Sequence, residues 1–301
     1  MTVKKIEGVF APIATPFNAE GEIEFGKFAE NLAKFDKTRL AGIVVLGSNG
    51  EFAMLSRQEK IDLVAAVRKG LSADKMVIGG TGCESLKETI ELTKEAADNG
   101  ADAALIINPS YYKRDLNEST LEKFFSAAAD ASPIPVMVYN MPGNSGINLS
   151  ANLIVKLSAH TNIIGVKDSC GNIVQISETI AGVPSDFSVF AGSGSYLFVT
   201  TVLGGKGGTL AAANVAPDLF AEIYDLCQKK DYEKARKLQL DILQLNACVT
   251  SRHGIGGMKA AMDLAGFFGG APRLPLQPAS DSVIASIRIH IEKLGLLGKY
   301  K

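Results

Sequence analysis

A lysine at the end of a hydrophobic segment is the first residue in this sequence that could do chemistry. Residues 162–169 (NIIGVKDS) have the pattern of a buried strand that ends in the amine of Lys167. Burial disfavours the charged form of an amine, and a neutral amine can attack a carbonyl carbon. The structural alternative is an ion pair between Lys167 and Asp168 or another acid, and the position of Lys167 alone leaves both interpretations open.

A tyrosine is expected close to this lysine. Residues 134–140 (IPVMVYN) have the pattern of the preceding strand, and Tyr139 stands near its end. Neighbouring strands lie about 5 Å apart, so the phenol can reach an amine or a substrate oxygen on the next strand. The alternative role of Tyr139 is that of an ordinary core tyrosine.

A third group of polar residues lies in residues 46–55 (LGSNGEFAML). Gly47 and Gly50 bracket Ser48 and Asn49, which predicts a tight turn that presents backbone N–H groups, a hydroxyl and an amide. Such an arrangement of N–H groups binds a carboxylate, although an ordinary turn between strand and helix would show the same letters. We expect Glu51 to orient this turn rather than to contact substrate.

Other kinds of site find little support. The net charge is −1 and Lys and Arg are dispersed, so we expect no nucleic-acid partner. Two glycine clusters, GSGS at 192–195 and GGKGG at 204–208, complete no phosphate-binding motif. We expect no metal and no cofactor, because the histidines are in separate regions and the cysteines form no C-x-x-C pair; these residues are His160, His253 and His290, and Cys83, Cys170, Cys227 and Cys248.

The sequence shows no targeting or membrane-spanning segment. The first residues lack the apolar stretch of a signal peptide, and no run of about 18 apolar residues occurs. We therefore expect a cytoplasmic protein that does not interact with a membrane.

The elements that must position these residues follow a regular order. Eight short apolar segments begin near positions 8, 42, 76, 103, 134, 162, 187 and 207, and segments with helical periodicity lie between them. Continuous apolar strands are typical of a parallel sheet that is covered by helices. Eight strand–helix units favour an α/β fold of the (β/α)8 TIM-barrel type, and the alternative is an open doubly wound sheet.

The predicted barrel suggests a division of the chain and a location for the site. We expect a catalytic barrel over residues 1–230 and a C-terminal helical region, packed on it, over residues 231–301. Chemistry in such barrels lies at the carboxyl ends of the strands. The candidate site residues at those ends are Ser48, Asn49, Tyr111, Tyr112, Tyr139, Lys167, Gly192, Ser193 and Thr209.

Four motifs together resemble those of a known family. GSNGE, YNMPGNSG (residues 139–146), GVKDS and FAGS are similar in order and spacing to the dihydrodipicolinate synthase and N-acetylneuraminate lyase superfamily. The resemblance extends over nearly the whole chain. It implies a (β/α)8 barrel, usually a homotetramer built as a dimer of dimers, that condenses or cleaves 2-oxo acids through a Schiff base between a lysine and pyruvate.

The resemblance also implies a role for each matching residue. Lys167 would form the Schiff base and Tyr139 would relay protons. Ser48, Asn49 and Gly50 would hold the pyruvate carboxylate, and the first two would assist the relay. Tyr111 resembles a tyrosine that enters the site of a neighbouring subunit, although the pattern PSYY leaves Tyr112 as an alternative. Substrate-lining positions are matched by Asn144, Gly192 and Thr209.

Differences from the synthases favour one branch of the superfamily. Dihydrodipicolinate synthases typically have two threonines in the turn and an arginine where this chain has Asn144. A carboxylate that faces a neutral amide loses a charge-assisted bond worth about 1.5 to 3 kcal/mol. The motifs look most similar to the 4-hydroxy-2-oxoglutarate aldolases, which implies a lyase that releases pyruvate and glyoxylate. The alternatives are 4-hydroxy-tetrahydrodipicolinate synthase, an aldolase for 2-keto-3-deoxy sugar acids, and a non-catalytic sensor of 2-oxo acids.

Overall fold

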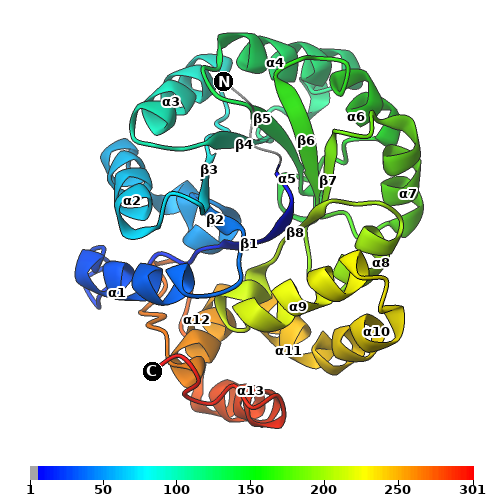
Figure 1. Cartoon of the computed structure of the whole chain (residues 1–301). Helices are drawn as coiled ribbons and strands as arrows, with labels where there is room; N and C mark the ends of the chain where they lie inside the picture. The colour runs from blue at the N-terminus through cyan, green and yellow to red at the C-terminus, as the bar shows by residue number, and fades with distance from the viewer. Residues whose placement is uncertain (1–5) are drawn as a thin grey trace.

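The computed structural model describes residues 6–301, and a closed barrel of parallel strands forms its centre (Figure 1). Each strand pairs with the next along the chain, and the last closes on the first where Gly8 lies opposite Gly207. This confirms the predicted (β/α)8 fold. The strands are β1 (Gly8–Pro12), β2 (Gly42–Val45), β3 (Met76–Gly80), β4 (Ala103–Ile107), β5 (Val136–Asn140), β6 (Ile163–Asp168), β7 (Ser188–Ala191) and β8 (Gly207–Thr209).

Helices cover the outside of the barrel (Figure 1). Those that follow strands are α1 (Phe25–Asp36), α2 (Arg57–Gly70), α3 (Leu86–Asp98), α4 (Glu118–Ala131), α5 (Pro142–Ser145), α6 (Ala151–Leu157), α7 (Ile173–Gly182), α8 (Leu197–Val202) and α9 (Pro217–Gln228). Short 3-10 helices also occur in the loops: η1 (Ser48–Gly50), η2 (Phe52–Met54), η3 (Lys113–Asp115) and η4 (Ala211–Asn214).

Side-chain caps fix where two of the helices begin. The Ser56 hydroxyl accepts a hydrogen bond from the backbone N–H of Glu59, and the Glu59 carboxylate accepts one from the backbone N–H of Ser56, which completes the capping box of α2. At α3, Ser85 accepts from the backbone N–H of Glu88. The Glu88 side chain instead lines the cleft beside the barrel mouth.

Side chains fill the inside of the barrel. Alternate residues of the strands point inward, and Phe10, Val44, Ile78, Met137 and Phe190 are almost completely buried there. Tyr139 belongs to the same interior cluster. The packed interior leaves the mouth of the barrel, where the strands end, as the place for a site.

The C-terminal region is helical, as predicted, and packs on the barrel. Phe267 stacks on Phe35 of α1 with ring centroids 4.4 Å apart, and Asn31 exchanges two hydrogen bonds with the backbone of Phe268. This region therefore shares the hydrophobic core of the barrel. Its elements are α10 (Tyr232–Asp241), α11 (Leu243–Ala247), the π-helical segment η5 (Cys248–Arg252), α12 (Gly254–Ala265) and α13 (Asp281–Lys293).

Over residues 6–301, none of the helices combines the length and the hydrophobicity that a membrane crossing needs.

Candidate active site

Lys167 and Tyr139 meet at the carboxyl ends of neighbouring strands. Tyr139 of β5 is paired with Lys167 of β6 in the sheet register, and both side chains are buried. The Lys167 Nζ lies 4.0 Å from the centroid of the Tyr139 ring, which is within the range of a cation–π contact. The structure therefore brings the predicted amine and phenol together.

Lys167 has no acidic partner within the described residues, because Asp168 is bound elsewhere. One Asp168 carboxylate oxygen accepts a hydrogen bond of 3.0 Å from Asn140 and one of 3.3 Å from Gln175. The other oxygen accepts a 2.8 Å bond from the backbone N–H of Cys170. These bonds satisfy the carboxylate without a cation, so the structural ion pair between Lys167 and Asp168 is not formed.

The phenol of Tyr139 is prepared to exchange a proton. Burial alone raises its pKa, but the charge of Lys167 and polar contacts with Ser48, Lys167 and Ser169 together hold the pKa below its usual value. The hydroxyls of Ser48 and Ser169 are buried and complete no hydrogen bond within residues 6–301. Both hydroxyls are therefore available to a substrate or to a proton relay through Tyr139.

The turn after β2 differs in detail from the prediction. Gly47 has φ −81° and ψ 176°, which is extended backbone that any residue can adopt. The left-handed conformations fall instead on Leu46 (φ 61°) and Glu51 (φ 60°), on either side of η1. Gly50 is needed for space rather than for its φ, since a Cβ there would lie 3.0 Å from the backbone oxygen of Ile13.

The amides of this turn are suited to hold an anion. Ser48 and Asn49 open the single turn of η1, so their N–H groups have no acceptor inside it. The carbonyl of Gly50 accepts a 2.7 Å bond from the hydroxyl of Thr15 and so cannot turn toward a ligand. The Asn49 side chain donates to the sulfur of Met258 at 3.4 Å. Asn49 therefore contributes its backbone N–H to the site.

The remaining predicted residues at the barrel mouth follow β7 and β8. Gly192 donates its backbone N–H to the carbonyl of Asp168 at 2.7 Å, and a Cβ at Gly192 would lie 2.6 Å from that same oxygen. Thr209 ends β8 and is buried. Gly192 therefore permits a close approach of two chain segments beside Lys167.

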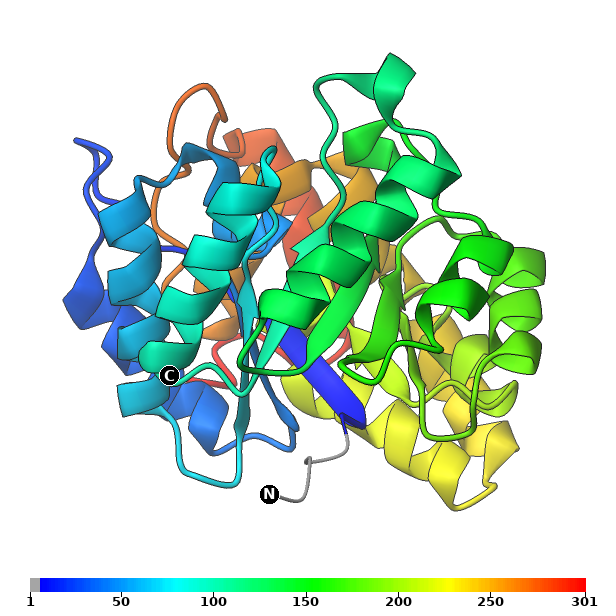
Figure 2. The ribbon, with the colours of Figure 1, turned by 90° about the horizontal axis from the view of Figure 1, so that it is seen from above.

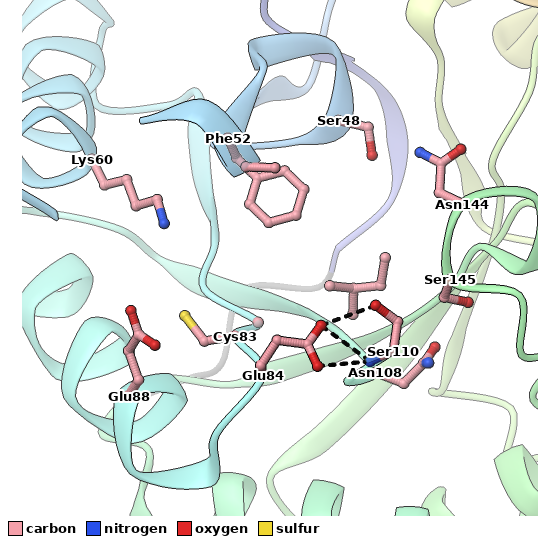
Figure 3. A pocket seen from close by; sticks show the side chains of 13 residues that line it. Ser48, Phe52, Lys60, Cys83, Glu84, Glu88, Asn108, Ser110, Asn144 and Ser145 are labelled. Atoms are coloured by element: carbon pink, nitrogen blue, oxygen red, sulfur yellow. Dashed lines mark hydrogen bonds between the residues drawn. The ribbon is translucent and has the colours of Figure 1, made fainter. Parts of the chain in front are cut away.

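A cleft of about 400 Å³ opens above the ends of β2 to β5 (Figure 3). Ser48 and Asn144 lie on one side of the cleft, and Lys60 and Glu88 lie on the opposite side. Ser48 also lines a smaller and deeper pocket with Tyr139. Ser48 thus lines both the pocket of Tyr139 and the cleft, and the exposed Asn144 lines the cleft alone.

Tyr111 lies outside this buried group within one chain. Its side chain is 79% exposed, and that of Tyr112 is 70% exposed, with ring centroids 5.1 Å apart. The loop that carries both tyrosines includes η3 and projects from the face where the strands end (Figure 2). Glu84 holds the base of the loop by accepting bonds from the backbone N–H groups of Ser110 and Tyr111. Figure 3 shows the bonds between Glu84 and Ser110.

One polar residue of the site was missed by the sequence analysis. Ser169 directly follows β6, and its hydroxyl contacts the phenol of Tyr139. Its place immediately after Lys167 and Asp168, at the carboxyl end of a predicted strand, was a signal that could have identified it.

The closed barrel places a buried lysine and tyrosine together at the ends of two adjacent strands, on the C-terminal face where barrel enzymes have their active sites. The sequence profile of the Dihydrodipicolinate synthetase family matches residues 5–294, and the chain belongs to this family. It is an enzyme of the aldolase type, a carbon–carbon lyase.

Individual relatives differ in the names of their substrates. An L-threo-3-deoxy-hexylosonate aldolase of Hypocrea jecorina is 36% identical over 93% of this chain and 93% of its own. A probable mitochondrial 4-hydroxy-2-oxoglutarate aldolase of Emericella nidulans is 36% identical over 93% of this chain and 92% of its own. A 4-hydroxy-tetrahydrodipicolinate synthase of Archaeoglobus fulgidus is 35% identical over 97% of this chain and 99% of its own.

Solved structures agree with the fold. The chloride-inhibited dihydrodipicolinate synthase of Acinetobacter baumannii, complexed with pyruvate, superposes with a TM-score of 0.92 at 29% identity, over 97% of this chain and 100% of that one. The comparisons therefore confirm the resemblance to the superfamily, while relatives of similar identity carry three different activities.

Proposed function

We propose that this protein is a class I aldolase that cleaves a 4-hydroxy-2-oxo acid, with 4-hydroxy-2-oxoglutarate as the leading substrate and pyruvate and glyoxylate as products. The observation that carries the proposal is the buried Lys167, which has no carboxylate partner within residues 6–301 and contacts the ring of Tyr139. Burial of an amine without an acid partner costs stability, and groups of this kind occur preferentially at functional sites.

The central steps of the proposed reaction use Lys167 and Tyr139 of one subunit. Lys167 Nζ attacks the 2-oxo carbon, and loss of water from the carbinolamine gives an iminium ion. The bond between C3 and C4 then breaks, the electron pair passes into the iminium to form an enamine, and the 4-hydroxyl proton goes to Tyr139. Protonation of the enamine and hydrolysis release pyruvate and restore the amine.

The choice of substrate depends on the outer part of the cleft. Asn144 has an uncharged amide where the family resemblance places the arginine of the synthases, which disfavours 4-hydroxy-tetrahydrodipicolinate synthase activity. Uncharged polar side chains, Asn108, Ser110 and Ser145, line the same part of the cleft. They also suit the hydroxyl groups of a 2-keto-3-deoxy sugar acid, so this substrate is the second candidate.

The mechanism is tested by trapping the proposed Schiff base. Incubation of the protein with pyruvate and borohydride should add one reduced pyruvyl group, and peptide mass spectrometry should place it on Lys167. The Lys167→Ala variant is the control and should remain unmodified. An unmodified Lys167 in the wild-type protein would rule out the mechanism.

The substrate is tested by comparing turnover of three reactions. These are cleavage of 4-hydroxy-2-oxoglutarate, cleavage of 2-keto-3-deoxy sugar acids, and condensation of pyruvate with aspartate semialdehyde. The highest kcat/KM should belong to the first, and a clear preference for the last would identify a synthase. Reversible pyruvate binding without turnover of any substrate would support the alternative of a 2-oxo acid sensor.

The assembly and the cellular location also remain proposals. We expect a homotetramer, built as a dimer of dimers, in which Tyr111 enters the site of a neighbouring subunit. A cytoplasmic location stays a prediction as well, since one relative is named as mitochondrial. Light scattering of the purified protein and cell fractionation would test these two expectations.

A further inference from the structure

A buried ion pair joins the C-terminal helices to the turn after β2. Lys259 Nζ on α12 lies 2.6 Å from a carboxylate oxygen of Glu51, and the two side chains are 2% and 0% exposed. Removing two charges from water costs several kcal/mol per ion before their attraction is counted. Apolar side chains of the same volume would pack α12 on the barrel without this cost, so packing alone does not explain the pair.

Both partners are held in one position by further bonds. Lys259 donates to the backbone carbonyls of Thr15 at 2.8 Å and Ala271 at 2.7 Å, and its Nζ lies 4.7 Å from the ring centroid of Phe17. The second carboxylate oxygen of Glu51 accepts a 2.8 Å bond from the backbone N–H of Arg273. The ion pair between Lys259 and Glu51 is therefore a fixed joint between α12 and the turn after β2, unlike a mobile ion pair on the surface.

The joint acts on a residue whose backbone is strained. Glu51 has φ 60°, in the left-handed region that is unfavourable for a residue with a Cβ. Its N–H bonds to the carbonyl of Ser48 at 3.1 Å and so closes η1. Strained backbone of this kind persists only where the surroundings hold it in place.

The same helix contacts the turn at a second point. Met258, next to Lys259 on α12, accepts the bond from the side chain of Asn49. Thr15, whose carbonyl binds Lys259, donates its hydroxyl to the carbonyl of Gly50. The contacts of Thr15, Met258 and Lys259 thus hold one side of the turn, at Asn49, Gly50 and Glu51.

We propose that Lys259 is a positioning residue, which through its ion pair with Glu51 holds the amides of Ser48 and Asn49 in the orientation that binds the substrate carboxylate. This inference rests on the proposed function, because it assumes that these amides bind the carboxylate of pyruvate. Lys259 touches neither Lys167 nor Tyr139 in any interaction of the described residues. Its loss should therefore weaken substrate binding far more than the chemical step.

The Lys259→Met variant tests the proposal, since methionine is also unbranched but carries no charge. In borohydride trapping, the pyruvate concentration for half-maximal labelling should rise about tenfold or more, while the maximal labelling rate stays within about threefold. This split separates a positioning role from general damage to the fold. An unchanged half-maximal concentration would overturn the proposal.

A double variant covers the case in which Lys259→Met leaves Glu51 as an unpaired buried charge and prevents folding. Glu51→Gln combined with Lys259→Met removes both charges and should fold. It should show the same loss of pyruvate affinity, because a neutral amide no longer forms the charged joint. Wild-type affinity in the folded double variant would overturn the proposal.

A matched control and a second readout complete the experiment. Lys34 also ties the C-terminal region to the barrel, through a 2.7 Å bond to the carbonyl of Gly266. Lys34→Met should leave pyruvate affinity unchanged, and an equal loss there would assign the effect to general loosening. Amide hydrogen exchange in residues 46–55 should accelerate in Lys259→Met and not in Lys34→Met.

The exchange measurement also separates the two proposals. Absence of a pyruvate adduct in the wild-type protein would reject the proposed function without reporting on the joint. Faster exchange in Lys259→Met would still support the mechanical role of the ion pair, and equal exchange in both variants and the wild type would reject it.

Discussion

The amine of Lys167 and the phenol of Tyr139 impose opposite requirements on one small space. In the proposed mechanism the amine must lose its proton before it attacks, and the phenol must accept and return protons in later steps. Their contact serves the second need, because the lysine charge holds the pKa of the tyrosine below its usual value against the effect of burial. The same contact keeps the aromatic ring in place beside the amine.

Replacing Tyr139 by phenylalanine separates these two contributions. Tyr139→Phe keeps the ring over Lys167 but removes the hydroxyl, so kcat should fall about 100-fold or more while KM changes little. The measurement is steady-state cleavage of 4-hydroxy-2-oxoglutarate. Tyr300→Phe, which removes a partly buried hydroxyl bound to Asp218, is the control and should retain its kcat. A wild-type kcat in the Tyr139→Phe enzyme would show that the hydroxyl of Tyr139 does not relay protons.

At the residue scale, local pattern predicts the candidate reacting groups but not their surroundings. Lys167 and Tyr139 were predicted because each ends an apolar strand. Whether Lys167 pairs with Asp168 could not be predicted, because the outcome depends on Asn140 and Gln175, which come from other elements and satisfy the carboxylate.

At the scale of elements, the close approach of the ends of β6 and β7 requires a glycine, Gly192, which has no Cβ. Gly192 lets its own backbone approach that of Asp168, and a Cβ there would come within 2.6 Å of the Asp168 carbonyl and 2.8 Å of the Ser169 Cα. Contacts this short cannot be relieved by turning a side chain, because both atoms belong to the backbone. The end of β6, with Lys167, would have to move.

Gly192→Ala should therefore destabilise the protein by about 1–3 kcal/mol, the usual cost of overpacking, and should reduce activity as well. Urea unfolding followed by far-ultraviolet circular dichroism measures the first effect. Gly26→Ala is the matched control, since a Cβ at that helical position meets nothing within 4 Å and should stabilise the protein by about 0.5–1 kcal/mol. Equal stability of the two variants would contradict the steric argument.

The elements themselves were largely predictable, whereas the contacts between distant elements were not. Strands with both faces buried leave a clear signal of β-branched and apolar residues, and the observed strands begin within about two residues of the predicted positions. The sequence predicts a tight turn bracketed by Gly47 and Gly50, but the left-handed residues of this turn are Leu46 and Glu51. The contact that holds Glu51 could not be predicted, because its partner Lys259 lies far along the chain on a helix outside the barrel.

At the scale of the whole molecule, the exposed side chains of Tyr111 and Tyr112 indicate that a single chain lacks a surface to cover them. Two adjacent aromatic side chains on a projecting loop expose 79% and 70% of their surface, and Glu84 anchors the base of that loop. Exposure of this extent is costly for aromatic groups in a protein that stays alone. It fits an assembly in which the loop is covered by, and contributes to, a neighbouring subunit.

Subunit complementation tests this arrangement directly. Lys167→Ala lacks the amine and Tyr111→Phe lacks the phenol, so each alone should be nearly inactive. When the two are co-expressed, about half of randomly formed pairs are mixed, and each mixed pair contains one site with both groups intact. Roughly a quarter of wild-type activity should return in the mixture if Tyr111 crosses the interface.

The same experiment with Tyr112→Phe decides between the two tyrosines, since only the variant of the crossing residue should be rescued. A mixture no more active than the sum of its parents would mean that each chain completes its own site. In that case the loop would have to fold back onto its own barrel mouth, and the exposure of both rings would need an explanation other than assembly.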